Sequence, residues 1–104
     1  MKKLIVAPAA KRDLRNIYQH ISLDSVHYAE ALLIDLTSKI KWIAEVDFTG
    51  SPRDYIRKGL RGLPFRKRCI YYRSYSDRIV VLRILHSAQD VARQKFDEQQ
   101  DNDN

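Results

Sequence analysis

The sequence has few of the residues that form disulfides, build glycine-rich phosphate-binding loops or span membranes. It contains one cysteine, Cys69, which cannot close an internal disulfide, so the chain is not a disulfide-stapled secreted domain. Its three glycines, Gly50, Gly59 and Gly62, do not form a phosphate-binding loop. No stretch approaches the roughly 20 apolar residues of a membrane span, and Pro8 interrupts the N-terminal run before a signal peptide develops. These absences predict a cytoplasmic protein.

Charge is unevenly distributed along the chain. Nineteen Lys and Arg against thirteen Asp and Glu give a net charge of +6, but four of the acids, Asp97, Glu98, Asp101 and Asp103, lie in the last eight residues. Without these four, nineteen cations meet nine carboxylates, a net +10. Such a body attracts nucleic acid, an acidic polypeptide or an acidic groove on an enzyme, and charge alone does not choose among them.

The length and the composition of the C-terminus predict one domain with a tail. A chain of 104 residues has room for one hydrophobic core. We expect the domain to span residues 1–96. Residues 97–104 contain no apolar side chain, so we expect them to form an acidic disordered tail.

Apolar spacing predicts a short strand followed by two helices. Residues 3–7 form an aliphatic edge strand, and Pro8 suits the first turn of a helix over about residues 9–22. A second apolar stripe predicts a helix that ends near Glu45, for which Ser22, Asp24 and Ser25 offer capping oxygens. Because few residues separate the two helices, we expect an antiparallel helical hairpin.

Three strands are predicted in the second half. They are residues 58–63, 69–75 and 78–86, with a tight hairpin at residues 76 and 77. The order β-α-α-β-β-β predicts an α+β fold, in which the helical hairpin packs on one face of a small, mainly antiparallel sheet. We expect the other face to be open and to present guanidinium groups.

The last strand is apolar on both faces, which is typical of a strand with neighbours on either side. Simple alternation predicts two sets of side chains on opposite faces. One set is Ile79, Val81, Arg83 and Leu85, and the other is Val80, Leu82, Ile84 and His86.

Cations and aromatic residues gather in the second half of the chain. Planar guanidinium groups beside aromatic rings suit phosphate contact and base stacking, but they also keep a sheet face soluble or pair with an acidic partner. The residues are Arg53, Arg57, Lys58, Arg61, Arg66, Lys67, Arg68, Arg73, Arg78 and Arg83, with Tyr55, Phe65, Tyr71, Tyr72 and Tyr75.

Catalytic signals are weak. Arg68, Arg83 and His86 could supply part of a metal-independent ribonuclease site, but residues 87–90 add no tyrosine, lysine or second histidine. Cys69 has no histidine nearby to activate it and is expected to pack in the interior. Acids such as Asp13 are expected to be surface pairs of small energetic weight. Neither the carboxylates nor the histidines have metal-ligand spacing, so no metal and no cofactor is predicted.

Several blocks of the sequence resemble the RelE/ParE toxins of type II toxin-antitoxin systems. Residues 9–18 are similar to the opening helix of that family. Residues 59–61, 68–73 and 81–90 are similar to its strand motifs. The resemblance extends to about Val91, and the blocks occur in the family's order and at its intervals.

The resemblance implies one of two activities. RelE-like toxins cut messenger RNA on the ribosome, and ParE-like toxins poison DNA gyrase. Arg57 and Lys58 lie near RelE-like lysines, but Gly59 occupies a matching position and the sheet end lacks the later arginine and tyrosine. The ending at residues 85–90 is similar to the ParE-like form. We therefore favour a ParE-like gyrase inhibitor; a RelE-like ribonuclease and an inactive basic binding module remain the alternatives.

The resemblance also implies a partner, a ParD-like antitoxin with a DNA-binding N-terminal domain, and hence a hetero-oligomer. An acidic or amphipathic segment of that antitoxin would fold along the toxin, as a helix on the hairpin or as a strand at a sheet edge. Motif position and charge suggest five contact residues for the target or the antitoxin: Arg61, Arg68, Arg73, Arg83 and His86.

Overall fold

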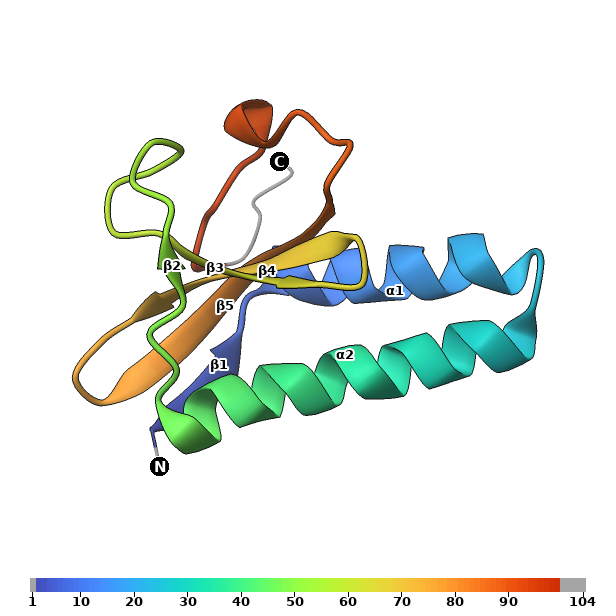
Figure 1. Ribbon diagram of the computed structural model, residues 1–104, viewed down its shortest axis with the longest axis horizontal. Helices are drawn as coiled ribbons and strands as arrows, with labels where there is room; N and C mark the ends of the chain where they lie inside the picture. The colour runs from blue at the N-terminus through green and yellow to red at the C-terminus, as the bar shows by residue number, and fades with distance from the viewer. Residues whose placement is uncertain (1, 100–104) are drawn as a thin grey trace.

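The computed structural model describes residues 2–99, which form two helices packed on a mixed five-stranded sheet. The elements are β1 (Lys3–Val6), α1 (Pro8–Ser22), α2 (Val26–Val46), β2 (Ser51–Pro52), β3 (Arg61–Phe65), β4 (Arg68–Ser74), β5 (Arg78–His86) and a 3₁₀ turn η1 (Val91–Arg93). The strand order is β1-β5-β4-β3-β2, in which β1 runs parallel to β5 and the other pairs are antiparallel. The predicted architecture is confirmed; β2 is one strand more than the sequence suggested (Figure 1).

Local sequence sets the ends of the helical hairpin. Pro8 begins α1, where its missing N–H would have no partner in any case. The side chain of Ser25 caps α2 by accepting a hydrogen bond from the Tyr28 amide at 3.1 Å, as the capping prediction allowed. Asp47, with φ of 53°, ends α2 in the left-handed conformation. Figure 1 shows α1 and α2 side by side, with their connection lying beyond the end of the sheet.

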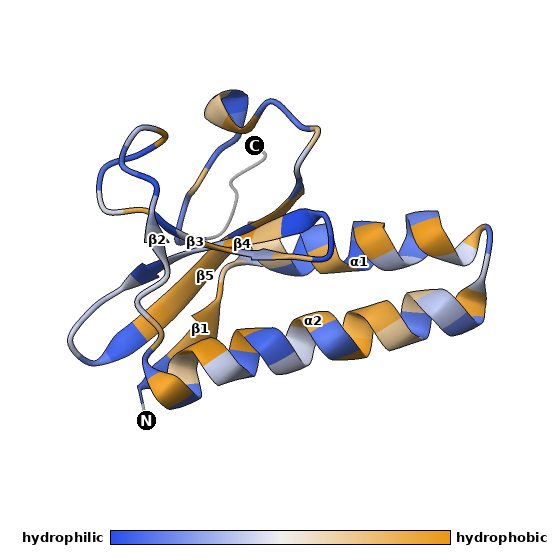
Figure 2. Ribbon diagram, viewed as in Figure 1, coloured by the Kyte–Doolittle hydropathy of each residue, from blue (hydrophilic) through white to orange (hydrophobic). Residues whose placement is uncertain are grey.

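The main core lies between the helices and the sheet. Leu32, Leu36, Ile40 and Ile43 project from α2 and are at most 3% exposed; the sheet contributes Ile70, Tyr72, Ile79, Val81 and Ile84. Full burial of each such side chain contributes about 1.5–3 kcal/mol. The hydroxyl of Tyr72 donates to the Phe48 carbonyl at 2.8 Å, so this buried polar group is satisfied. In Figure 2 the apolar colour runs along most of β5.

The second face of the sheet is not an open arginine surface, so that expectation is wrong. An apolar cluster lies there, which includes Leu60, Tyr71, Leu82 and Phe96. Two irregular segments cover it, residues 53–60 and residues 91–96 (Figure 1). The carbonyl groups of such segments have no strand partner and need other donors. Guanidinium groups supply them: Arg57 donates to the carbonyls of Ala92 and Gln94 at 3.3 and 3.0 Å.

A β-bulge corrects the predicted alternation in β5. Tyr71 lies opposite Arg83, but the next residue, Tyr72, lies opposite Val81, so Leu82 is an extra residue in β5. Ile79, Val81 and Ile84 therefore face the helices, whereas Val80, Leu82 and Leu85 face the second cluster. Arg83 and Leu85 consequently do not share the face of Ile79 and Val81.

The boundaries of β3 and β4 also differ from the prediction. The strand expected at residues 58–63 lies at Arg61–Phe65, and Leu60 is buried before it. Two residues, Arg66 and Lys67, join β3 to β4, and both adopt positive φ, 50° and 64°. Positive φ at both central residues defines a type I′ turn, which normally carries Asn-Gly. Neither residue signalled a turn in the sequence.

The predicted tail lies only partly within the described residues. Residues 97–99 are described, and the Tyr75 hydroxyl donates a hydrogen bond to the carboxylate of Glu98. Residues 100–104 lie outside the described part of the chain.

Candidate functional site

The five residues predicted to contact a target do not share one surface. Arg68 and His86 lie opposite each other on β4 and β5. Arg61 lies opposite Tyr72 on the same face of the sheet and donates to the Thr49 carbonyl at 2.9 Å. Arg73 lies on the other face, where it donates to the Lys58 carbonyl at 2.6 Å. The structure thus brings together only Arg68 and His86 of the predicted set.

Arg83 is held in a buried ion pair with Asp13 of α1. Its Nε and Nη2 donate to the two carboxylate oxygens at 2.7 and 2.9 Å, and the side chains are 14% and 12% exposed. Asp13 Oδ2 also accepts the Ile84 amide at 3.0 Å. The strand β1 pairs with β5 only as far as Val81. The Ile84 amide lies beyond the end of β1, and the Asp13 carboxylate accepts its hydrogen bond in place of a strand partner. Asp13 is therefore a structural acid, in contrast to the surface pair expected from sequence.

A recess of about 380 Å³ lies beside Arg68 and His86, between the end of the sheet and α1. His20 and Asn16 of α1 also line it. His86 Nδ1 accepts a hydrogen bond from the Ala88 amide at 3.0 Å. This hydrogen bond occupies the lone pair of Nδ1, so Nδ1 is not available to accept a proton from a substrate in this geometry.

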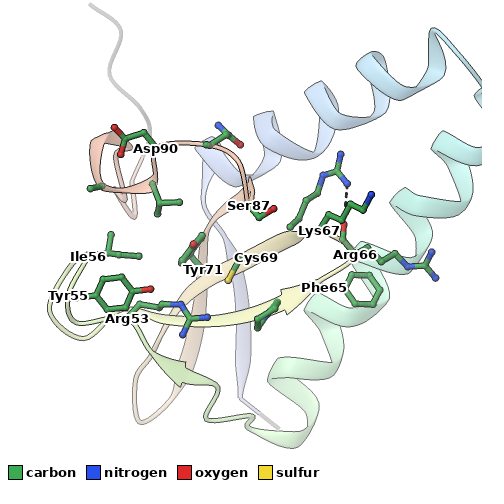
Figure 3. A pocket seen from close by; sticks show the side chains of 15 residues that line it. Arg53, Tyr55, Ile56, Phe65, Arg66, Lys67, Cys69, Tyr71, Ser87 and Asp90 are labelled. Atoms are coloured by element: carbon green, nitrogen blue, oxygen red, sulfur yellow. Dashed lines mark hydrogen bonds between the residues drawn. The ribbon is translucent and has the colours of Figure 1, made fainter.

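A larger groove of about 700 Å³ lies at the end of the sheet on its second face (Figure 3). Three segments form its walls: residues 53–56, the β3–β4 turn with its flanks at 64–69, and residues 87–92. Cys69 and Tyr71 of β4 line its floor and are 9% and 6% exposed. Figure 3 shows Tyr55 and Ile56 on one wall, with Lys67 and Ser87 on the opposite side.

The lining of this groove is basic. The lining contains four cations, Arg53, Arg66, Lys67 and Arg68, and one carboxylate, Asp90; of the four cations, Arg66 is ion-paired with Asp35 at 2.7 Å. Asp90 is already within 3.2 Å of Arg93. A concave surface with an excess of one charge concentrates the opposite charge, so the groove attracts anionic groups.

The two ionisable groups on the floor stay protonated. Burial raises the pKa of the Cys69 thiol despite the opposing effect of the nearby Arg53 guanidinium. Burial also raises the pKa of the Tyr71 hydroxyl to about 12, with a further contribution from Cys69. A neutral, buried thiol is a poor nucleophile, as the sequence predicted for Cys69.

Sequence reasoning named Arg53, Tyr55 and Lys67 as part of a general basic and aromatic region but did not single them out as site residues. Tyr55 lines the groove and is 81% exposed, so its ring is accessible from solvent. The available signal was the repeated pairing of Arg or Lys with an aromatic residue at 53–55 and 65–67. Their convergence depends on the turn after β3, which the sequence did not reveal.

Residues 2–99 contain neither a metal-binding cluster nor a membrane-spanning helix. No group of three or more His, Cys, Asp and Glu side chains there is arranged to hold a metal ion. No helix in the same part of the chain is both long enough and apolar enough to span a bilayer.

The fold and its surface define a small α+β protein with a strongly basic groove, and comparison with known proteins identifies the family. Residues 4–91 match the family described as "ParE toxin of type II toxin-antitoxin system, parDE". The chain belongs to this family, and the predicted ParE-like branch is confirmed. A solved structure described as "Chromosomal ParDE TA system from P. aeruginosa" is similar, with a TM-score of 0.71 and 26% identity over 83% of this chain and 96% of that chain. No curated protein sequence gives a significant match.

Proposed function

We propose that this protein is a toxin that inhibits DNA gyrase and arrests replication and growth until a cognate antitoxin neutralises it. The observation that carries the proposal is the match of residues 4–91 to the ParE toxin family. The toxin acts in the cytoplasm, where its target and its antitoxin meet it, and it forms a hetero-oligomer with the antitoxin.

The site geometry supports inhibition by binding in preference to RNA cleavage. A metal-independent ribonuclease needs a base, an acid and a group that neutralises the phosphorane. Here Nδ1 of His86 is engaged by the Ala88 amide, and the Arg83 guanidinium is neutralised by Asp13. Of the two arginines predicted for a ribonuclease site, Arg83 is ion-paired, and Arg68 has no ion-pair partner among residues 2–99. A gyrase inhibitor needs no such acid-base set.

The charge of the protein supports capture by an acidic antitoxin. A body with a net charge of +10 accelerates encounter with an acidic segment, and a small domain gains stability from a tight partner. Binding at the basic surface would then block access to the target.

The test compares two activities of the purified protein. We expect it to block supercoiling by the gyrase of its host, or to trap cleaved DNA, while translation of a reporter messenger RNA continues. Arg68→Ala and His86→Ala should leave messenger RNA on translating ribosomes uncut, as the unmodified toxin does. Cleavage of that RNA by the unmodified toxin, lost in both variants, would replace the proposal with the ribonuclease alternative.

A growth experiment tests the toxin-antitoxin assignment itself. Induced expression should arrest growth, and co-expression of the adjacent gene product should restore it. Normal growth on induction, with folded protein present in the cells, would leave the inactive binding module as the better account.

A further inference from the structure

We propose that the recess between α1 and the end of the sheet is a phosphate-binding site, which holds a backbone phosphate of duplex DNA. The recess has a volume of about 380 Å³, and Arg68 and His86 of the sheet, His20 and Asn16 of α1 and Gln89 after β5 line it. The choice of DNA rests on the proposed function, because an inhibitor of gyrase acts beside the DNA that gyrase holds. The charge of the recess, its hydrogen-bond donors and its walls each suit this ligand.

The recess contains a positive charge that no carboxylate neutralises. Arg68 is half-buried and has no ion pair among residues 2–99, and its hydrogen bond to the Arg66 carbonyl is long, at 3.5 Å. Among the same residues, no Asp or Glu lines the recess. A cation that is partly removed from water without a counterion is costly, and a bound anion relieves that cost. The guanidinium group suits phosphate in particular, because it can donate two parallel N–H bonds to it.

Within residues 2–99, backbone amides occupy two acceptors of the recess, and donors remain. Nδ1 of His86 accepts the Ala88 amide at 3.0 Å, and a neutral ring that accepts at Nδ1 carries its proton on Nε2. The side-chain carbonyl of Gln89 accepts the His86 amide at 2.7 Å, so the NH₂ group of Gln89 remains to donate. The recess therefore offers N–H groups to a ligand, and the oxygens of a phosphate can accept several of them at once.

Three segments of the fold bring these donors together. Arg68 is the residue opposite His86 in the β4–β5 pairing, so the two side chains leave the sheet on the same face. Asn16 and His20 are one turn apart on α1, which places them on the same side of that helix. The amide of Gln89 donates to the His86 carbonyl at 3.0 Å, which fixes the turn after β5. Groups held by regular structure are preorganised for a ligand.

The walls of the recess favour the backbone of a duplex over single-stranded RNA. Ile17 and Ile84 are apolar walls beside the donors, and a less polar surrounding strengthens charge-assisted hydrogen bonds. No Phe, Tyr or Trp of residues 2–99 lines the recess, so an unpaired base lacks the rings on which it would stack. The bases of a duplex are already paired, and its phosphates are the groups that it presents to such a surface.

The direct test titrates a DNA duplex of about 12 base pairs into ¹⁵N-labelled protein at low salt. The backbone amides of Ala88 and Gln89 and the ring resonances of His20 and His86 should shift together. Inorganic phosphate should move the same resonances, but only at a higher phosphate concentration. Shifts confined to other faces of the protein would overturn the assignment.

Two competing ligands test the choice of DNA. If inorganic phosphate occupies the recess at a lower concentration than the duplex, the recess is a site for a free phosphate group and the DNA assignment is wrong. A single-stranded RNA of the same length and charge should bind no more tightly than the duplex. Tighter binding of that RNA at the same resonances would also overturn the choice.

Two variants and one charge-matched control separate the recess from the general charge of the protein. Arg68→Gln should weaken the duplex about tenfold and should reduce the salt dependence of log K by about 0.9, the value for one phosphate contact. His20→Ala should weaken it several-fold at an unchanged thermal unfolding temperature, because the side chain is exposed. Lys41→Gln removes one charge at an exposed position of α2 that does not line the recess, and should change neither property. Equal weakening by Arg68→Gln and Lys41→Gln would show that DNA is attracted by the whole body, and the site would be wrong.

The same variants in the gyrase assay distinguish this inference from the proposed function. Arg68→Gln and His20→Ala should both inhibit supercoiling less than the unmodified toxin, whereas Lys41→Gln should inhibit it equally. If the unmodified toxin inhibits gyrase and the two recess variants inhibit it just as well, the recess assignment fails while the proposed function stands. If the unmodified toxin does not inhibit gyrase but the duplex still occupies the recess, the proposed function fails and the recess assignment stands.

Discussion

Replacement of Asp13 by alanine is expected to be among the most damaging single changes outside the apolar core. The Asp13 carboxylate accepts three hydrogen bonds, from Arg83 Nε and Nη2 and from the Ile84 amide, at 2.7, 2.9 and 3.0 Å. Alanine leaves the guanidinium without its counterion and an edge amide of β5 without an acceptor. Both groups lie in a region where the two partner side chains are only 12–14% exposed.

The magnitude follows from the burial of the pair. Removal of one partner from a buried ion pair costs about 3–5 kcal/mol, because an uncompensated charge remains. An unsatisfied amide alone costs about 1–3 kcal/mol. Arg83 keeps a bond to the Lys95 carbonyl at 3.1 Å, so we expect a loss near the lower end, about 3 kcal/mol. In a domain of this size that loss lowers the thermal unfolding temperature by on the order of 15 °C.

The assay is urea unfolding followed by the fluorescence of Trp42, which packs against Phe48 with ring centroids 4.9 Å apart. Asp35→Ala is the matched control. It removes the ion pair between Asp35 and Arg66, whose side chains are 40% and 47% exposed, and should cost less than about 1 kcal/mol. Asp13→Asn, which retains an acceptor for the Ile84 amide, should fall between the two. Equal losses for Asp13→Ala and Asp35→Ala would refute the claim that the Asp13 pair holds α1 to β5.

Three further predictions concern the two clusters. Gly50→Ala should cost about 2–3 kcal/mol, because Gly50 has φ of +64° and an added Cβ would meet the Tyr72 hydroxyl; an unchanged urea midpoint would contradict this. Burial raises the pKa of Tyr71 and of Tyr72 to about 12, whereas tyrosine in the unfolded chain ionises near pH 10. The free energy of unfolding is therefore unaffected by these groups below about pH 10. Between pH 10 and 12 it falls by about 2–3 kcal/mol for each tyrosine. Tyrosine absorbance at 295 nm measures this titration, and release of both protons near pH 10 in folded protein would count against it. Buried Cys69 should resist a disulfide reagent at pH 8 until the chain unfolds, so complete reaction within seconds in the native state would show that the floor of the groove is open.

Much of the fold could be predicted because it depends on local signals. Helical periodicity marked α1 and α2, and Ser25 and Pro8 marked two of their ends. The apolar run at Arg78–His86 marked β5 with correct boundaries. The turn after β3 could not be predicted in this way, because Arg66 and Lys67 adopt a conformation that their own side chains disfavour. Contacts outside the turn, including the ion pair to Asp35, hold it in place.

The candidate site was predicted less well, because its residues belong to segments far apart in the chain. Arg68 and His86 meet as expected for neighbouring strands. Arg83 was assigned to a contact surface from its motif position and its charge, but the carboxylate of Asp13, seventy residues away, holds it in a structural ion pair. Arg53, Tyr55 and Lys67 gained importance only when the loops around the groove had been located.

The sequence by itself determined the class of this protein: apolar periodicity fixes which segments are helices and strands, and net charge fixes the sign of its partners. The tertiary structure alone decided which cations remain available to a partner. Whether a guanidinium has a counterion depends on which groups the packed chain brings to it from distant segments. Arg83 is therefore paired with Asp13 in the folded chain, whereas Arg53 has no ion pair among residues 2–99.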